Sequence, residues 1–335
     1  MTTIVGHHRL ALCFTIRLVS VLRCFALLVS PLLTATASAQ QFGCSWMTYP
    51  EPDDTSHVWF RRTFVAAGSG QRPREALLYV ATTGRLVVYV NGRSIASSLY
   101  VPHRALGDTT AIGLTLDVRR FLRPDTNVVA IAYCPSIRTR HQLSLTLYGM
   151  RADGTRFAIS GADGWLCRKA DSWQTIGGEA LDRTAYQFDW TSARQPLALW
   201  LAAEDGNDSL IGQPVHNLGQ TPSSIFPPST LTYLPLAADG PVVKNVSQPL
   251  LVRQSADSLV YNLPREFHGF VRVTLRDCCA GERILIGNLL YVCSGTVDEQ
   301  AFARFAPYTG NSLVIRGDRH FRSQQVQNVE VLQTR

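Results

Sequence analysis

The feature that most constrains this chain is a long succession of short strand-like runs separated by turn signals. Residues 57–65 alternate apolar and polar side chains, and apolar runs follow at 76–80 and 86–90. Asn91–Gly92, directly after the last of these, is the strongest short-range signal for a tight β-hairpin. Similar runs lie at 114–118, 127–133, 143–148 and 155–160. Many short strands between turns favour a β-sandwich over a parallel α/β sheet, and helical pattern is scarce beyond one turn at 118–122.

The second half of the chain repeats this character after an interruption. Residues 163–203 are rich in Trp, and residues 206–249 are rich in Pro, Ser and Gly. Strand patterns then resume at 250–253, 258–261, 269–275, 283–286, 313–315 and 326–332. We therefore predict an all-β fold with two β-sandwich domains of the jelly-roll or concanavalin-like type. The domains are expected at residues 40–161 and 249–335, joined by a Trp- and Pro-rich connecting segment at 162–248.

The first 39 residues predict a secretory signal peptide. Arg17 and Arg23 precede the apolar run 24–29, and Ala37–Ser38–Ala39 has the small-x-small pattern of a cleavage site. The arginines interrupt the stretch, so a membrane anchor is the weaker alternative, and we expect no membrane span after cleavage. The formal charge is +7, and removing residues 1–39 lowers it to +4. This charge is too small to indicate nucleic-acid binding. We expect an exported protein: periplasmic, on the cell surface or extracellular.

Six cysteines follow the predicted cleavage site: Cys44, Cys134, Cys167, Cys278, Cys279 and Cys293. An even number in an oxidising compartment predicts disulfides, with 15 connectivities open. A pairing of Cys278 or Cys279 with Cys293 would be local. Buried free thiols are the alternative. No His or Cys spacing typical of a zinc site occurs, so we expect neither a metal nor another cofactor.

Several motifs in the first predicted sandwich resemble a sugar-binding jelly roll of bacterial glycosidases. They are Trp59–Phe60–Arg61–Arg62–Thr63–Phe64, Tyr89–Val90–Asn91–Gly92, Leu116–Asp117–Val118 and Asn127–Val128–Val129–Ala130–Ile131. Further motifs follow in order: Trp165 to Trp173, Gly178–Glu179–Ala180–Leu181–Asp182–Arg183, Trp190, Tyr261–Asn262–Leu263, Gly269–Phe270–Val271–Arg272–Val273, Ala280–Gly281–Glu282, Phe305–Ala306–Pro307–Tyr308 and Arg319–His320–Phe321–Arg322. Together they resemble the β domains of α-L-rhamnosidases of glycoside hydrolase family 78, collinear from about residue 59 to residue 332.

The resemblance implies the non-catalytic β portion of such an enzyme. In the family, the catalytic carboxylates lie on an α/α toroid that follows these β domains, and this chain ends at Arg335. Two family positions differ: residues 264–268 replace a Gln-Asn pair, and residues 286–288 replace an acidic position. Acidic candidates exist at Glu179/Asp182, Glu204/Asp205/Asp208 and Asp298/Glu299, but all fall in predicted loops. We therefore expect no catalytic residue in this chain.

The remaining expectation is weak binding of a carbohydrate or glycan, rhamnose-containing ones among the candidates. Sugar rings stack on aromatic faces while Arg and carboxylates bind their hydroxyls. The predicted ligand-binding residues are Trp165, Trp173, Glu179, Arg183, Tyr186 and Trp190. Two structural alternatives stay open, because such Trp and Tyr residues often belong to a core, and Glu179 and Arg183 could pair with each other. The functional alternatives are a degenerate or split rhamnosidase subunit with a separate catalytic chain, and an interaction protein of the cell envelope.

Overall fold

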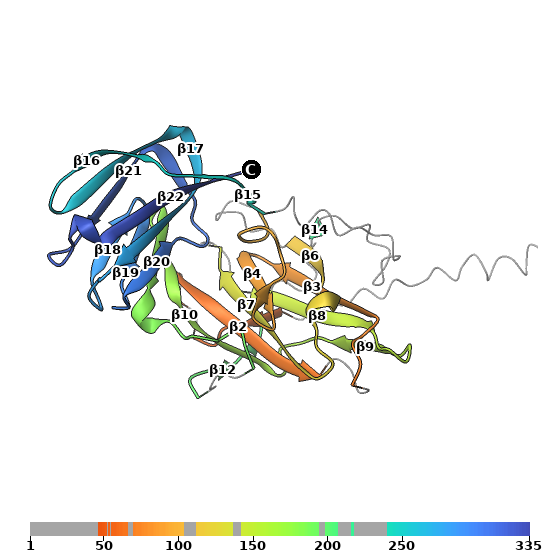
Figure 1. Ribbon diagram of the computed structural model, residues 1–335. Coiled ribbons are helices and arrows are strands. Elements are labelled where there is room, and N and C mark those ends of the chain that lie inside the picture. Colours follow the sequence, from red (N-terminus) through yellow and green to blue (C-terminus); the bar gives the residue numbers. More distant parts are fainter. Residues whose placement is uncertain are drawn as a thin grey trace, which may run out of the picture. The chain divides into compact units, whose positions relative to one another are not determined.

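The computed structural model describes residues 46–51, 53, 55–65, 70–103, 112–136, 142–193, 198–206, 216–217 and 240–335 (Figure 1). The predicted signal peptide, Cys44 and most of the Pro-rich stretch lie outside the described residues. No helix in the described ranges is long and apolar enough to cross a membrane.

The described strands confirm the predicted all-β sandwich fold. One layer of the first sandwich is a sheet with the order β13-β1-β8-β3-β6-β14, and β9 pairs with β8. Its strands are β1 (Trp46–Thr48), β3 (Glu75–Thr82), β6 (Ile112–Asp117), β8 (Gln142–Met150), β9 (Arg156–Ile159), β13 (Glu204–Asp205) and β14 (His216–Asn217). The facing layer contains β10-β2-β7-β4-β5, and β12 pairs with β10. Its strands are β2 (Ser56–Val65), β4 (Arg85–Val90), β5 (Arg93–Ser94), β7 (Thr126–Cys134), β10 (Trp165–Thr175) and β12 (Leu201–Ala202).

The predicted hairpin joins β4 to β5. Asn91 and Gly92 both have positive φ, 52° and 82°, as the tightest hairpin turns require. The Asn91 side chain fixes the turn: its Oδ1 accepts the N–H of Val128, and its Nδ2 donates to the Phe121 carbonyl. The predicted single helical turn is the 3-10 helix η1 (Arg119–Phe121).

The second sandwich is organised by one long strand, β17 (Ser258–Arg276). Its first part pairs with β16 and β21, and its last part pairs with β20 and β22. The register shifts between Asn262 and Phe267, where Glu266 has a positive φ of 55°. The remaining elements are β15 (Val243–Ser247), β16 (Leu250–Gln254), β18 (Arg283–Ile286), β19 (Leu289–Val292), β20 (Asp298–Phe302), β21 (Tyr308–Gly317), η4 (Ser323–Gln325) and β22 (Val326–Thr334).

The Trp-rich segment supplies the strand that connects the two sandwiches. β11 (Gly178–Asp182) pairs antiparallel with β10 and parallel with β19, and the 3-10 helix η2 (Arg183–Ala185) follows it. Gly178 is required there, because a Cβ atom would stand 1.9 Å from the Asn288 carbonyl oxygen. The sheet therefore continues from one sandwich into the other through a segment that the sequence presents as a connection. The predicted domain boundaries stay predictions.

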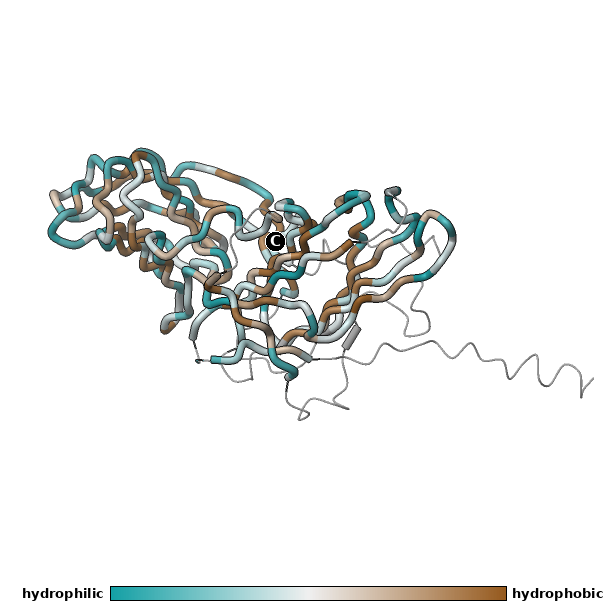
Figure 2. The backbone as a smooth tube through the Cα atoms, turned by 90° about the horizontal axis from the view of Figure 1, so that it is seen from below, coloured by the Kyte–Doolittle hydropathy of each residue, from teal (hydrophilic) through white to brown (hydrophobic). Residues whose placement is uncertain are grey.

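The sheet that runs through both sandwiches, from β15 to β5, is called the shared sheet. Both of its faces are buried around its centre. In β2, Val58 and Phe60 point into the core of the first sandwich, whereas Trp59 points into a second apolar cluster with Ala130 and Phe305. Figure 2 shows hydrophobic residues following the strands and hydrophilic ones following the loops. Because strand side chains alternate, His57, Trp59 and Arg61 share the outer face of β2. That face forms part of the candidate site.

Candidate functional site

A cavity of about 550 Å³ lies where the outer face of β2, together with β10, β11 and η2, meets the second sandwich. Four of the six predicted ligand-binding residues line it: Glu179, Arg183, Tyr186 and Trp190. Sequence reasoning missed several other wall residues, which come from distant parts of the chain: His57, Tyr89, Asp171, Arg272, Gln300 and Arg304.

The other two predicted residues lie elsewhere. Trp165 is buried in the core of the first sandwich beside Phe60 and Cys167. Trp173 is half-buried on β10 and does not line the cavity. Both occur in the same strand as the cavity residue Asp171, but the β-bulge between Lys169 and Trp173 changes which face each position meets.

Glu179 is the buried acidic centre of the wall. Its Oε2 accepts the backbone N–H groups of Arg304, Phe305 and Ala306 at 2.9, 2.8 and 3.2 Å. Burial raises the pKa of Glu179 to about 7, although these N–H groups and the Arg304 charge lower it. The carboxyl group therefore anchors the 304–306 segment against β11.

His57 and Ser172 lie beside Glu179 without forming a catalytic triad. His57 Nδ1 is 2.8 Å from Ser172 Oγ and 3.8 Å from Glu179 Oε1. A nucleophilic serine requires the hydroxyl on one ring nitrogen and the acid on the other, but both contacts here use the same atom. Glu179 and His57 are also almost fully buried, with 2% and 1% of their surface exposed. This cluster is consequently a structural network.

Arg183 pairs with Asp171 instead of Glu179. Arg183 Nη1 donates to Asp171 Oδ2 at 2.9 Å, and its guanidinium lies 3.8 Å from the centre of the Tyr186 ring. The alternative pairing of Glu179 with Arg183 is wrong, because it needs helical geometry and these residues lie on a strand followed by a 3-10 turn. Burial raises the pKa of Asp171, against the opposing effect of Arg183.

The aromatic wall has a buried base and an exposed rim. Trp59 and Trp190 stack with ring centroids 4.8 Å apart and are 4% and 5% exposed. Tyr186 meets the edge of Trp59 at 5.9 Å and is half-buried. Phe188, 73% exposed, packs edge-on against Tyr186 at 5.2 Å. Phe188 is thus the accessible aromatic face next to the cavity, a position that the motif comparison did not single out.

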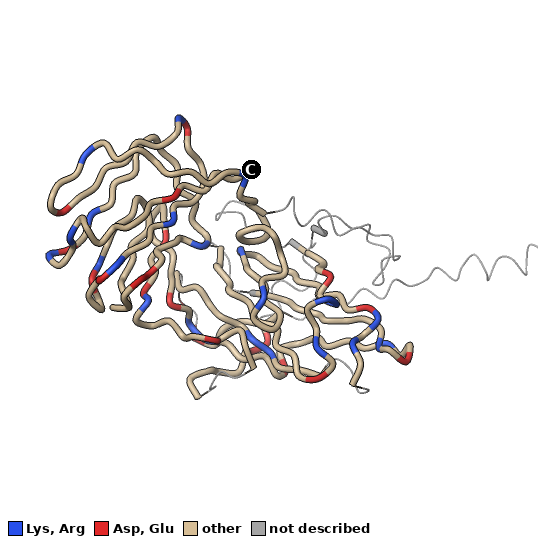
Figure 3. Tube along the Cα trace, in the orientation of Figure 1, with Lys and Arg blue, Asp and Glu red and all other residues tan. Residues whose placement is uncertain are grey.

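Two further arginines reach the wall from the second sandwich. Arg272 on β17 donates from Nε to Glu330 Oε2 at 2.6 Å, and its cross-strand position opposite Glu330 explains the pair. Arg304 donates to the hydroxyl of Tyr89, whose ring meets Trp190 at 5.6 Å. Figure 3 shows basic and acidic positions interspersed along the described chain. The cavity therefore combines aromatic surface with several guanidinium groups.

Four of the carboxylates considered as catalytic candidates have structural partners. Glu179 binds backbone N–H groups, and Asp182 accepts the N–H of Thr184 at 3.0 Å to cap η2. Asp298 pairs with Arg276 at 2.8 Å. Glu299 accepts from the Tyr291 hydroxyl and from the N–H of Ser294. Glu204 and Asp205 are exposed on β13, and Asp208 lies outside the described residues.

The five cysteines that the structure describes are free thiols, so the predicted disulfides are not formed among them. Cys134 and Cys167 belong to clusters on opposite faces of the shared sheet and cannot meet. Cys278 and Cys293 lie in the core of the second sandwich, and Cys279 is exposed. Burial raises the pKa of Cys167 to about 12.

Within the described residues, no group of three or more His, Cys, Asp or Glu side chains could hold a metal ion.

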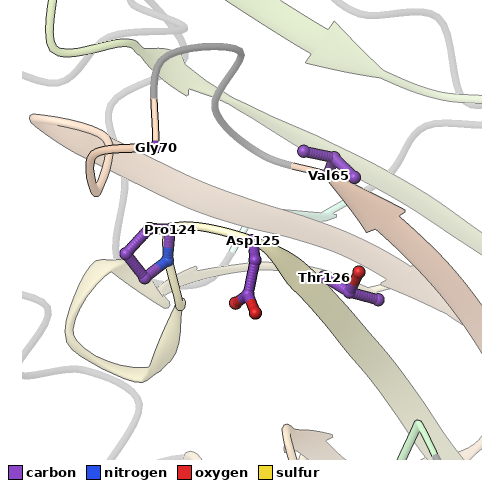
Figure 4. A pocket seen from close by; sticks show the side chains of 5 residues that line it. All are labelled: Val65, Gly70, Pro124, Asp125 and Thr126. Carbon is purple, nitrogen blue, oxygen red and sulfur yellow. The ribbon is translucent and has the colours of Figure 1, made fainter.

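A second hollow lies at the end of β2. Figure 4 shows its side chains: Val65, Pro124, Asp125 and Thr126, close to Gly70. The described residues that line it offer one carboxylate and no aromatic ring, so they lack the groups that make the first cavity a candidate.

No protein-family model and no curated protein matches this sequence. Solved structures share its fold. An α-L-rhamnosidase from Dictyoglumus thermophilum matches with a TM-score of 0.70 and 15% identity, over 87% of this chain and 35% of that chain. A Streptomyces avermitilis α-L-rhamnosidase complexed with L-rhamnose matches with a TM-score of 0.68 and 16% identity, over 84% of this chain and 29% of that chain. The α-L-rhamnosidase from Aspergillus terreus matches with a TM-score of 0.66 and 13% identity, over 88% of this chain and 36% of that chain. This chain thus has the fold of a portion of these enzymes and spans about a third of their length.

Proposed function

We propose that the protein is a non-catalytic carbohydrate-binding protein and that the cavity beside Tyr186 and Phe188 holds the sugar. The observation that carries the proposal is a cavity lined by the Tyr186 ring and by guanidinium and amide groups, with the exposed ring of Phe188 packed against Tyr186 at its edge. Sugars use these two kinds of contact together, since C–H faces stack on rings and hydroxyls bind polar groups. The shared fold with α-L-rhamnosidases supports the same reading.

The carboxylates support the non-catalytic part of the proposal. Glycoside hydrolysis uses two carboxyl groups that flank the scissile bond. Of the two that line the cavity within the described ranges, Glu179 is held by three backbone N–H groups and Asp171 by Arg183. The second candidate function is a subunit of a glycoside hydrolase whose catalytic domain belongs to another chain. It is supported by the fold that the chain shares with a portion of the α-L-rhamnosidases.

Export is part of the proposal, with the protein acting in the periplasm, on the cell surface or outside the cell. It is supported by the basic and apolar pattern of residues 1–39 and by the small-x-small site at Ala37–Ser38–Ala39. Sequencing the N-terminus of the exported protein would test it. The expected first residue is Gln40.

Isothermal titration against L-rhamnose and rhamnose-containing oligosaccharides tests the binding. Phe188→Ala should weaken binding by roughly fivefold, because stacking on one aromatic ring is worth about 1 kcal/mol. Val297→Ala removes another exposed apolar side chain, 67% exposed on a loop before β20, and should leave binding unchanged. Absence of binding to every sugar tested would overturn the proposal. Turnover of a nitrophenyl rhamnoside only after a second chain is added would favour the subunit.

A further inference from the structure

The charges on the cavity wall point to a more specific ligand than a neutral sugar. Three arginines of the described part of the chain line the wall: Arg183, Arg272 and Arg304. Arg183 is neutralised by Asp171 at 2.9 Å, and Arg272 is neutralised by Glu330 at 2.6 Å. Arg304 differs, because its guanidinium hydrogen-bonds the neutral hydroxyl of Tyr89 and makes no ion pair among the described residues.

Among the described residues that line the wall, Glu179 is the acidic group besides Asp171, and it is already engaged. Glu179 and Asp171 both lie near enough to act on the charge of Arg304. Glu179, however, directs its Oε2 at the backbone N–H groups of residues 304–306 and is 2% exposed. Asp171 is 6% exposed and bonded to Arg183. Neither carboxylate therefore occupies the donors of Arg304.

Arg304 is also fixed in place and open to a ligand. Its own backbone N–H is held by Glu179 at 2.9 Å, and its side chain is held by Tyr89. Its surface is exposed, unlike that of its neighbours Ala303 and Phe305. A guanidinium offers five N–H donors in a planar fork that matches a carboxylate. Gln300, exposed on the same wall, adds an amide for hydroxyl groups.

From this arrangement we infer that the ligand is a carboxylated sugar, such as a uronic acid residue, whose carboxylate pairs with Arg304. The inference rests on the proposed carbohydrate site and specifies its ligand class. The aromatic rim would contact the sugar ring while Arg304 binds its carboxylate. A neutral sugar would offer the guanidinium donors of Arg304 no anionic acceptor, so it should bind less well.

The test compares matched sugars by isothermal titration of the full chain. The pairs are D-galacturonate with D-galactose, and D-glucuronate with D-glucose, and the methyl ester of D-galacturonate keeps the shape without the charge. Each acid should bind roughly tenfold more tightly than its neutral partner and the ester, as expected for one charge-assisted pair. Acetate should not bind measurably. Arg304→Gln should abolish the preference, whereas Arg316→Gln, an exposed arginine on β21, should retain it.

The outcomes separate the two proposals. Binding of L-rhamnose or another neutral sugar as tight as that of the acids would overturn the inference and leave the carbohydrate site standing. Absence of binding to all sugars would overturn both. An acid preference that survives in Arg304→Gln would overturn the role of Arg304. Because this substitution keeps the backbone N–H that binds Glu179, thermal unfolding should change little, and Arg304→Lys should show an intermediate preference.

Discussion

The carboxylate of Glu179 accepts the backbone N–H of Phe305 at 2.8 Å, which joins the strand before η2 to a segment more than a hundred positions later in the chain. The same oxygen also accepts from Arg304 and Ala306. One buried side chain therefore holds the loop after β20 that carries Arg304 at the cavity. The wall of the site and the attachment between the sandwiches depend on the same residue.

Replacing Glu179 should destabilise the protein strongly. Glu179→Ala leaves three buried N–H groups without an acceptor, so the free energy of unfolding should fall by about 3 kcal/mol or more. Asp182→Ala, which removes the half-buried cap of η2, should cost about 1 kcal/mol or less. Urea unfolding of both variants measures the difference. Equal losses would show that the Glu179 network does not hold the loop.

Stability should depend on pH through Glu179. Its folded pKa of about 7 lies above the ordinary value of 4.5, so the folded protein binds a proton that the unfolded chain has already lost. The free energy of unfolding should therefore fall as pH rises through this window, by up to about 1.4 kcal/mol per pH unit. Below the window the contribution is fully present. Urea unfolding at several pH values should show this slope, and Glu179→Gln should remove it. An unchanged slope in that variant would assign the effect to other groups.

The two kinds of aromatic residue at the cavity should behave differently on truncation. Trp190 is buried and stacked on Trp59, so Trp190→Ala should cost about 3–5 kcal/mol of stability. Phe188 is exposed, and Phe188→Ala should change stability by less than about 0.5 kcal/mol. Thermal or urea unfolding checks both. A Phe188→Ala variant as unstable as Trp190→Ala would mean that Phe188 is a packing residue and not an available binding surface.

The exposure of the thiols provides a check on the second sandwich. Cys279 is exposed, whereas Cys134, Cys167, Cys278 and Cys293 are buried. After reduction, a thiol reagent should label the folded protein quickly at Cys279, and the other four should react only on unfolding. Cys279→Ser should remove one equivalent of the fast labelling. Fast reaction of Cys293 in the folded state would contradict its place in the core.

Local patterns were enough to predict the strands, but not the site. The alternation in β2 and the Asn91–Gly92 turn are encoded by neighbouring residues, and the structure confirms both. The sequence could also single out Glu179, Arg183, Tyr186 and Trp190, because they lie close together in one segment.

The other half of the wall could not be found in this way. His57 and Arg304 reach the cavity only through tertiary pairing, and no local pattern connects either of them with Glu179. Trp165 shows the opposite error: its residue type favoured binding, but the register of β10 directs it into the core. The ion pair of Arg183 likewise depends on β11 being a strand. In a helix, Glu179 would lie next to Arg183, whereas in the structure Arg183 pairs with Asp171.

The most direct test of a carbohydrate site is to map which backbone amides respond to a saturating sugar in NMR spectra of the isotope-labelled protein. We predict shifts concentrated at Arg183, Tyr186, Phe188 and Arg304, with residues around Asp125 in the second hollow unaffected. Phe188→Ala should reduce these shifts at the same sugar concentration. A saturating sugar that shifts no amide around the cavity, or that shifts only residues remote from it, would contradict the account.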